Sequence, residues 1–321
     1  MSSPKDDEKT NKPTDTKNES TKLEPKDEVV ITEHVISVNG QALHYTATTG
    51  TLVMKDEEGK AKASLFFIAY TKKDVNDLSQ RPLTISFNGG PGSSSVWLHL
   101  GLLGPRRVVS GDVDRLQPPP YRLTNNEHTL LTETDLVFID PVSTGYSRAV
   151  EKDKAKEFHG LEKDIESVGA FIHLYVTRYK RWNSPKFLIG ESYGTFRSAA
   201  VGNLLQNRYS MHLNGICLIS SVLDLATITF AAGDDRPYIF YLPSYAAVAW
   251  YHKVAKPRAG GLPEFVEEAR KYAQGEYADA LFKGNALPAA QKAAVAKKLA
   301  YFTGLSEEYL LKANLRPTLG Q

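Results

Sequence analysis

The sequence predicts an α/β fold with a mostly parallel central sheet, antiparallel strands at its amino-terminal side and a helical segment after it. Three observations indicate this fold. Short apolar runs recur along the first two thirds of the chain, an amphipathic stretch separates two of them, and no such run follows residue 222. Strand, helix and strand in succession are typical of a doubly wound sheet, in which helices cover the sheet faces.

The first 28 residues are predicted to form a disordered leader. Of the first 27 residues, 13 are charged, and Met1 and Leu23 are the sizeable apolar ones. Such a segment buries too little apolar surface to offset its chain entropy. It has no apolar core of an export signal, so the protein is expected to be periplasmic or secreted if a signal has been removed, and cytoplasmic otherwise.

The core is predicted over residues 29–222 and begins with antiparallel strands. The runs "EHVISV", "ALHYTA" and "AKASLFFIAYT" are rich in β-branched and aromatic residues. Asn39-Gly40 and the charged stretch "KDEEGK" separate them and predict turns. We therefore expect an antiparallel edge on the sheet.

Four later runs are nearly all apolar, which is typical of parallel strands that are buried on both faces. They are "LTISFN" (83–88), "DLVFID" (135–140), "KFLIGE" (186–191) and "GICLIS" (215–220). Between the second and third, apolar residues recur at spacings of four and three, which predicts a helix that covers the sheet. The stripe consists of Leu161, Ile165, Val168, Ile172, Tyr175, Tyr179 and Trp182.

Residues 223–321 are predicted to form a helical cap or insertion packed on the sheet. Their proline-punctuated, alanine-rich and aromatic pieces, such as "PEFVEEARKYAQGEYADALF" and "PAAQKAAVAKKLAYF", fit amphipathic helices. No further strand of the sheet core is visible there. The carboxyl-terminal part of the sheet is therefore expected to be missing.

Composition excludes several classes of function. The 321 residues carry a formal net charge of +2 and no dense basic face, which argues against nucleic-acid binding and a polybasic membrane patch. No run approaches the roughly 18 apolar residues of a membrane span. The single cysteine, Cys217, permits neither an internal disulfide nor a CxxC motif, and we expect no metal and no cofactor.

The clearest chemical motif is "GESYG", residues 190–194, between an apolar strand and a predicted helix. It fits the nucleophile elbow G-x-S-x-G, in which a sharp strand-to-helix turn pushes the serine hydroxyl outward. Glycines flank the turn because a side chain there would collide with the neighbouring strand or helix. Ser192 is the predicted nucleophile.

A second motif, "NGGPG" at residues 88–92, directly follows a predicted strand. The oxyanion hole of an α/β-hydrolase takes one backbone N–H from the residue after the nucleophile and one from a loop after an earlier strand. Tyr193 and this loop fit those places, since glycines let the main chain approach a developing oxyanion. A mere tight turn would need only one glycine and one proline. The predicted fold is therefore an α/β-hydrolase with a helical cap.

Together, "FNGGPGSSS", "LLTETDLVFIDPVSTGYSRA" and "IGESYGT" resemble the serine carboxypeptidase family, and "SVWLHLGLLGPRRV" is most similar to its bacterial branch. The resemblance covers about residues 30–220. It implies hydrolysis of C-terminal peptide bonds through an acyl-enzyme on Ser192, with peptide or protein C-termini as substrates.

The resemblance also implies roles for individual residues. Asn88, Gly89 and Glu191 would bind the terminal carboxylate, and the amides of Gly90 and Tyr193 would form the oxyanion hole. A buried glutamate can donate a hydrogen bond to a carboxylate only when it is protonated, so binding is expected to favour acidic conditions.

Two departures from the family lie near the glycine-rich loop. Ser93 stands where many members have a disulfide-forming cysteine, and Ser94 and Ser95 cannot replace it. The run "VWLHLGLLGP" offers no glutamate where eukaryotic members carry a further carboxylate-binding acid. We expect His99, close to this loop, to be structural or to line the pocket rather than to act in catalysis.

A third departure concerns the general base. In this fold the acid and then the histidine follow the serine, and in the family both follow the helical insertion. His212 and His252 are the histidines after Ser192, and neither follows a late strand. Pairing of His252 with Asp224, Asp234 or Asp235 is open on chain order alone.

The resemblance therefore implies a truncated and inactive front part of a serine carboxypeptidase. A related acyltransferase or esterase would use the same groups. A non-catalytic fragment or descendant that binds peptides or a partner chain is the alternative from another class. Oligomeric state is not readable from the sequence, although a missing half of the sheet would expose an apolar strand edge that favours association.

Overall fold

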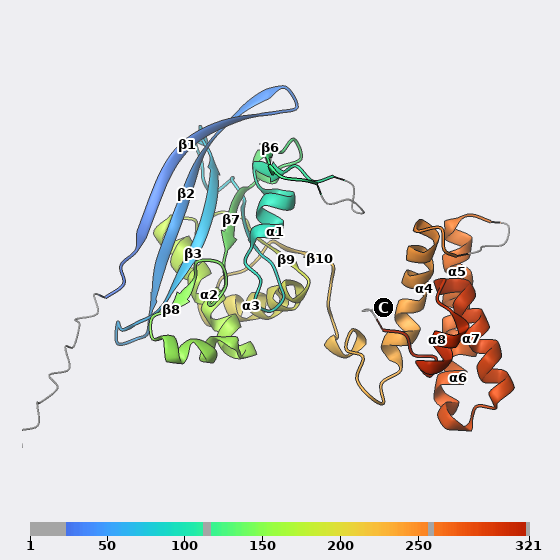
Figure 1. The fold of residues 1–321 in the computed structure, drawn as a ribbon. Helices are drawn as coiled ribbons and strands as arrows, with labels where there is room; N and C mark the ends of the chain where they lie inside the picture. Colours follow the sequence, from blue (N-terminus) through green and yellow to red (C-terminus); the bar gives the residue numbers. More distant parts are fainter. Residues whose placement is uncertain (1–23, 112–116, 256–259, 319–321) are drawn as a thin grey trace, which may run out of the picture. The chain divides into compact units, whose positions relative to one another are not determined.

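The structure is a computed structural model that describes residues 24–111, 117–255 and 260–318 (Figure 1). The chain divides into two compact units, Met1–Ser221 and Val222–Gln321, and each is described by itself. Residues 1–23 of the predicted leader lie outside the described residues. Asp27, which was assigned to the leader, belongs to the folded first unit, because its carboxylate accepts the Val53 N–H at 2.6 Å and pairs with Arg178.

The first unit is built on a mixed sheet with the strand order β1-β2-β3-β7-β4-β9-β10, and β8 pairs with β3. β1, β2, β3 and β7 are antiparallel to their neighbours in this order, whereas β7, β4, β9 and β10 run parallel. The predicted antiparallel edge and mostly parallel centre are confirmed. The strands are β1 (Glu28–Val38), β2 (Gln41–Lys55), β3 (Ala61–Lys72), β4 (Leu83–Phe87), β7 (Asp135–Ile139), β8 (Arg148–Ala149), β9 (Lys186–Glu191) and β10 (Gly215–Ile219).

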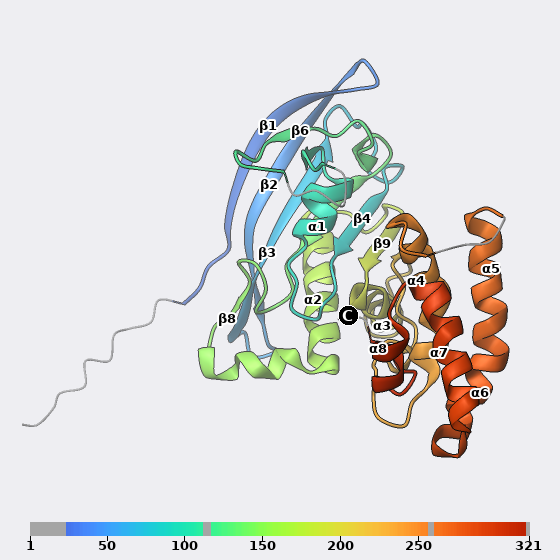
Figure 2. The same ribbon diagram turned by 45° about the vertical axis from the view of Figure 1, so that its right-hand side comes forward.

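Helices cover both faces of this sheet (Figures 1 and 2). α2 (Leu161–Arg178) and α3 (Tyr193–Tyr209) pack on one face, where Phe171 and Leu205 join strand residues such as Phe67 in one core. The short α1 (Val96–Leu98) and the π-helical turn His99–Leu103 cover the other face, where Leu98 and Leu103 pack on Phe138. The sheet is therefore doubly wound, as predicted.

Two of the predicted elements differ from the structure, one in burial and one in length. β10 was expected to be buried on both faces, but Ile216 and Leu218 are 42% and 40% exposed. The reason is its place in the sheet, because β10 pairs with β9 alone among the described residues. The predicted helix stripe extends too far, since α2 ends at Arg178 and Trp182 lies beyond it.

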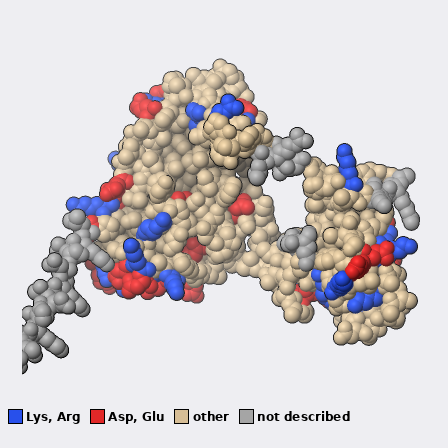
Figure 3. All heavy atoms as spheres, in the orientation of Figure 1, with Lys and Arg blue, Asp and Glu red and all other residues tan. Residues whose placement is uncertain are grey.

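Short elements complete the first unit and were not predicted. β5 (Arg106–Val108) and β6 (Leu123–Asn125) form a separate antiparallel pair. A single turn of 3₁₀-helix occurs at Leu130–Thr132, and a longer 3₁₀ segment spans Lys152–His159. On the face drawn in Figure 3, acidic and basic side chains lie side by side near this segment, where Glu151 pairs with both Lys60 and Lys154.

A buried ionic cluster ties the strands together at the amino edge of the parallel sheet. Asp135, which begins β7, accepts hydrogen bonds from Arg81 at 3.1 Å and from Arg181 at 2.6 Å. Arg181 also donates to the Arg81 carbonyl oxygen at 2.8 Å. All three side chains are at most 8% exposed, so each charge is buried with its partner.

The second unit contains helices and no strand within its described residues 222–255 and 260–318. Its core includes Leu242, Phe265, Leu299, Phe302 and Leu310. Its longer elements are α4 (Arg236–Tyr251), α5 (Leu262–Tyr272), the π-helical turn Ala273–Tyr277, α6 (Ala278–Lys283), α7 (Ala289–Thr303) and α8 (Glu307–Lys312), with 3₁₀ turns at Leu225–Thr227 and Gly284–Ala286. Within the described ranges, no helix has the length and apolar character needed to cross a membrane.

Candidate active site

Ser192 lies at a sharp turn between β9 and α3. Its backbone has φ 56° and ψ −124°, a region that L-residues rarely adopt. The Ser192 N–H donates to the Ile219 carbonyl at 2.9 Å, and its carbonyl accepts the Thr195 N–H at 2.9 Å. Hydrogen bonds on both sides therefore hold the strained residue in place at the carboxyl end of β9.

Glycines allow this turn to pack closely. A Cβ on Gly190 would lie 2.0 Å from the Gly194 carbonyl oxygen, and one on Gly194 would lie 2.8 Å from the Phe87 carbonyl oxygen. The space at these two positions is thus too small for any residue other than glycine, as expected for a nucleophile elbow. Strand, strained serine and helix, with a glycine-rich loop after the adjacent strand β4, are the arrangement of an α/β-hydrolase.

The "NGGPG" loop lies directly against the elbow. A Cβ on Gly89 would be 2.5 Å from the Tyr193 amide nitrogen and 2.6 Å from the Glu191 carbonyl oxygen. Gly90 has φ 109°, which requires glycine. The structure therefore brings Gly89 against Tyr193. Tyr193 and Gly90, the residue after Gly89, are the two that sequence reasoning assigned to the oxyanion hole.

Asn88 and Glu191 meet although 103 residues separate them in the sequence. The Asn88 side-chain amide donates to Glu191 Oε2 at 3.0 Å, and Asn88 Oδ1 accepts the Leu98 N–H at 3.0 Å. Asn88 is fully buried, whereas Glu191 is only partly buried and not enclosed as expected. The two predicted carboxylate-binding side chains thus lie at one point, and Glu191 is the more accessible of them.

Polar contacts hold the serine-rich segment that follows the loop. Asp140, at the end of β7, accepts the Ser95 N–H at 2.9 Å, and the Ser95 hydroxyl donates to the Ile139 carbonyl. Burial raises the pKa of Asp140, and the N–H groups of Ser95 and Tyr146 offset part of that rise. These bonds tie Ser95 to the end of β7.

His99 belongs to the core, as expected from the sequence. Its Nε2 shares a hydrogen bond with the Tyr70 hydroxyl at 2.7 Å, and its ring lies 4.7 Å from that of Phe138. Burial lowers the pKa of His99 to about 4. A histidine that stays neutral and is hydrogen-bonded to a tyrosine in this way has a structural role.

Arg197, one turn into α3, was missed by sequence reasoning. Its side chain is 1% exposed and forms a 2.9 Å ion pair with Asp164, in the first turn of α2. It also donates to the Asn88 carbonyl oxygen at 2.7 Å. The available signal was a lone arginine among small and apolar residues in "GTFRSAAVG".

A cavity of about 320 Å³ adjoins this cluster. Tyr193, Asp164 and Arg197 line it together with Pro91 and Gly92 of the glycine-rich loop, and His159 lies at its wall. Its volume is in the range of small-molecule and side-chain sites. The candidate active site therefore has a hollow beside the oxyanion-hole positions.

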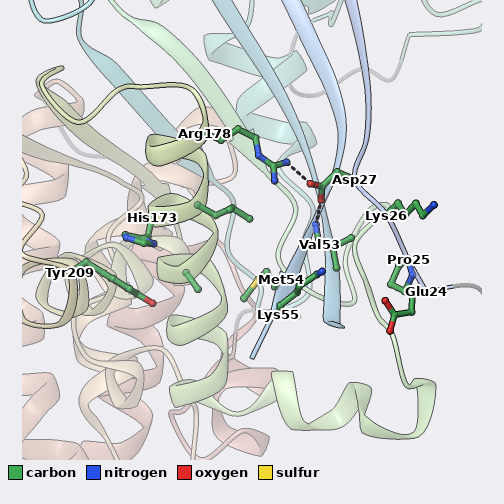
Figure 4. Close-up of a pocket in the computed structure, with 12 residues that line it drawn as sticks. Glu24, Pro25, Lys26, Asp27, Val53, Met54, Lys55, His173, Arg178 and Tyr209 are labelled. Atoms are coloured by element: carbon green, nitrogen blue, oxygen red, sulfur yellow. Dashed lines mark hydrogen bonds and ion pairs between the residues drawn. The ribbon is translucent and has the colours of Figure 1, made fainter. Parts of the chain in front are cut away.

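A larger cavity of about 690 Å³ lies elsewhere in the first unit, between the end of β2 and α2 (Figure 4). Val53, His173 and Tyr209 line it, and Asp27 and Arg178 pair across it. Tyr209 ends α3 and Ser192 precedes its start, so about 25 Å of helix separates this cavity from the elbow. Size alone therefore does not locate the candidate site.

His212 cannot serve as the base for Ser192. It lines a surface cavity with Lys186, the first residue of β9, and with Asn214, whose side chain accepts the Lys186 N–H. Ser192 follows the last residue of β9, about 20 Å away for six strand residues. His252, at the carboxyl end of α4, belongs to the second unit, where its ring packs edge-on against Tyr251. The described residues contain no cluster of His, Cys, Asp and Glu that could hold a metal ion.

Comparison with known sequences identifies relatives. The family model "Serine carboxypeptidase" matches residues 40–245. The pheromone-processing carboxypeptidase Kex1 of Saccharomyces cerevisiae is 34% identical over 145 residues, which cover 43% of this chain and 19% of the yeast protein. Serine carboxypeptidase-like 33 of Arabidopsis thaliana is 30% identical over 150 residues, which cover 45% of this chain and 29% of the plant protein.

Comparison with solved structures also finds peptidases, at low sequence identity. The crystal structure of Kex1 from Saccharomyces cerevisiae aligns with a TM-score of 0.48 and 24% identity, over 74% of this chain and 48% of the yeast chain. A proline iminopeptidase from Mycobacterium smegmatis aligns with a TM-score of 0.38 and 14% identity, over 81% of this chain and 72% of the other. In sequence, the matched part of this chain spans less than a third of Kex1 and of serine carboxypeptidase-like 33.

Proposed function

Because this chain belongs to the serine carboxypeptidase family, we propose that it binds peptides by their C-terminal carboxylate and cleaves the last peptide bond through Ser192. The observation that carries the proposal is the strained Ser192 elbow packed against the "NGGPG" loop. Such an elbow presents a hydroxyl beside backbone N–H donors, which is what acyl transfer requires.

In the proposed reaction, Ser192 Oγ attacks the carbonyl carbon of the last peptide bond. A base takes the serine proton, and the N–H groups of Gly90 and Tyr193 hold the resulting oxyanion. The intermediate collapses, the proton goes to the departing amine, and the C-terminal amino acid leaves. Water then attacks the acyl-enzyme and releases the shortened peptide.

The carboxylate of the substrate is proposed to bind at Asn88, Gly89 and Glu191. The 3.0 Å hydrogen bond between Asn88 and Glu191 supports this, since it joins two of the three at one point beside the elbow. A protonated Glu191 and the amide of Asn88 would both present donors to the carboxylate. Glu191 directly precedes Ser192, so the proposed carboxylate site lies beside the nucleophile, as cleavage of the last peptide bond requires.

The test is release of the C-terminal amino acid from an N-blocked dipeptide, measured by chromatography. Ser192→Ala should abolish release while the fold is retained, because only binding and the oxyanion hole remain. The same dipeptide with an amidated C-terminus is the matched control and should not be cleaved. Equal turnover by the alanine variant, or of the amidated peptide, contradicts the proposal.

A second candidate is that residues 1–321 bind peptide C-termini without cleaving them. The observation that favours it is that His212 lies at the amino end of β9, whereas Ser192 follows the carboxyl end. His212 therefore cannot act as the base for Ser192. Loss of a triad member lowers kcat by about 10⁴–10⁶. Labelling with a fluorophosphonate probe separates the candidates, since stoichiometric labelling at Ser192 requires a base and would make His252 the leading one.

A further inference from the structure

The guanidinium of Arg197 contacts Tyr193, one predicted oxyanion donor, and Asn88, two residues before the other donor, Gly90. It donates to the Asn88 carbonyl at 2.7 Å and to Asp164 at 2.9 Å. It also lies over the rings of Phe87 and Tyr193, at 5.4 and 5.1 Å from their centroids. One buried side chain on α3 therefore contacts the end of β4, the start of the glycine-rich loop and the residue after Ser192.

The contact with Asn88 fixes the glycine-rich loop. The Asn88 carbonyl and the Gly89 N–H belong to one peptide plane, so holding the oxygen fixes the plane from which the loop departs. Gly90, the predicted donor, is one peptide further along. Because the two glycines have no side chains to restrict their backbone, an external contact is needed to hold this segment in one conformation.

The contact with Tyr193 fixes the other donor. A planar guanidinium stacks on an aromatic face, and Asp164 lies beside the Tyr193 hydroxyl. Burial raises the pKa of Tyr193, and the Asp164 carboxylate raises it further. The tyrosine side chain is thus neutral and held on two sides, which restricts the orientation of its own backbone N–H.

We propose that Arg197, held by Asp164, is the positioning residue of the oxyanion hole and sets the Gly90 and Tyr193 N–H groups at a common distance from Ser192. The inference rests on the function proposed above. Asp164 keeps the buried guanidinium paired, and it comes from a third segment, the start of α2.

The chain contains a matched control for this cluster. Arg181 is also buried, pairs with an aspartate, Asp135, and donates to a backbone carbonyl. It lies at the amino edge of the sheet, at the far end of the strands from Ser192. Arg→Lys at either position keeps the charge and removes the planar fork. A merely structural role predicts the same outcome for both variants, whereas positioning predicts a difference at the site.

The first measurement is amide NMR of the whole chain, with hydrogen exchange at Gly90 and Tyr193. In Arg197→Lys, both amide signals should shift and exchange at least tenfold faster, whereas Arg181→Lys should leave them unchanged. Unchanged signals in Arg197→Lys, or equal changes in both variants, overturn the proposal. If Arg197→Lys does not fold, Arg197→Gln with Asp164→Asn leaves no buried charge unpaired and serves in its place.

The second measurement is hydrolysis of a nitrophenyl ester of an N-blocked amino acid, whose leaving group departs without a proton. Relative to Arg181→Lys, Arg197→Lys should lower kcat about 10²-fold with KM changed less than threefold, as expected for misplaced oxyanion donors. If the unmodified protein hydrolyses the ester, equal kcat in both variants overturns the positioning role; if it does not, the amide signals decide that role. If instead Ser192→Ala hydrolyses the ester as fast as the unmodified protein, the proposed function fails, and the amide signals still decide the role of Arg197.

Discussion

Glu191 and Asn88 share one hydrogen bond beside the elbow, so a bound carboxylate is expected to contact both side chains. In the Ser192→Ala background, we expect Glu191→Gln to strengthen binding of a peptide with a free C-terminus, because a glutamine amide donates a hydrogen bond and carries no negative charge. The same peptide with an amidated C-terminus should show no such gain.

Calorimetry with a short peptide measures this affinity without turnover. Glu133→Gln, a substitution of a glutamate in the loop before β7, is the control and should leave both affinities unchanged. If Glu191→Gln changes neither affinity, or changes both equally, Glu191 does not take part in carboxylate binding.

His99 makes stability depend on pH in a definite direction. Burial lowers its pKa from 6.5 in the unfolded chain to about 4 in the folded one. Between these values the unfolded state binds more protons, so the free energy of unfolding rises with pH and is fully gained above 6.5. The change from pH 4 to 6.5 amounts to about 3 kcal/mol at 1.36 kcal/mol per unit.

Urea unfolding at pH 4.5 and 7 measures this contribution. His99→Gln retains a hydrogen-bonding partner for Tyr70 and should lose most of the pH dependence that the unmodified protein shows. His128, whose side chain is 82% exposed, supplies the control variant His128→Gln, which should behave like the unmodified protein. The same difference between the two pH values in all three proteins would show that His99 is not the group responsible.

At the scale of elements, the junction of β9 and α3 depends on close backbone packing. Gly190→Ala would bring a Cβ to 2.0 Å from the Gly194 carbonyl, so backbone must move, and we expect a loss of about 1–3 kcal/mol or more. Gly101→Ala is the control, because no atom lies within 4 Å of its Cβ position. Thermal unfolding should separate the two variants by several degrees, and similar melting temperatures would contradict close packing at Gly190.

Most elements of the sheet could be predicted from the sequence, because each rests on a local pattern. The β1–β2 turn is an example: Asn39 and Gly40 have φ 50° and 78°, as a two-residue hairpin loop requires. The burial of β10 could not be predicted in the same way. Its apolar residues fit a central strand, but burial depends on which strands lie beside it, and a local pattern does not contain that information.

The site was predictable to a similar extent. Ser192 and the loop at 88–92 carry their own signals, a motif and a run of glycines, and the structure brings them together. Arg197 gave only a weak signal, because its partners lie 33 and 109 residues away in the sequence. Contacts of that separation are a property of the fold and have no local pattern.

At the scale of the whole molecule, the second unit has a core of its own. Its Phe265, Phe302 and Leu310 are at most 4% exposed, and Asp235, just before α4, pairs with Arg316, beyond α8. We therefore expect residues 222–321 expressed alone to form a helical domain, since about 100 residues with one core are sufficient for independent folding.

Circular dichroism of this fragment should show high helix content and a cooperative thermal transition. Asp235→Ala should lower its midpoint by several degrees, because Arg316 would be left half-buried without its partner. Lys312→Ala, whose ion pair with Glu308 is highly exposed, is the control and should have little effect. A broad, non-cooperative transition would mean that this unit needs the rest of the protein to fold.

The backbone of Ser192, at φ 56° and ψ −124°, opposes selection for thermal stability to selection for a serine at this position. Glycine adopts that conformation freely, whereas serine holds it at a cost of about 1–3 kcal/mol. A mutant library selected for heat resistance alone should accordingly enrich glycine at position 192. Retention of serine at this position in a library selected for activity as well as heat resistance would indicate that the hydroxyl is needed.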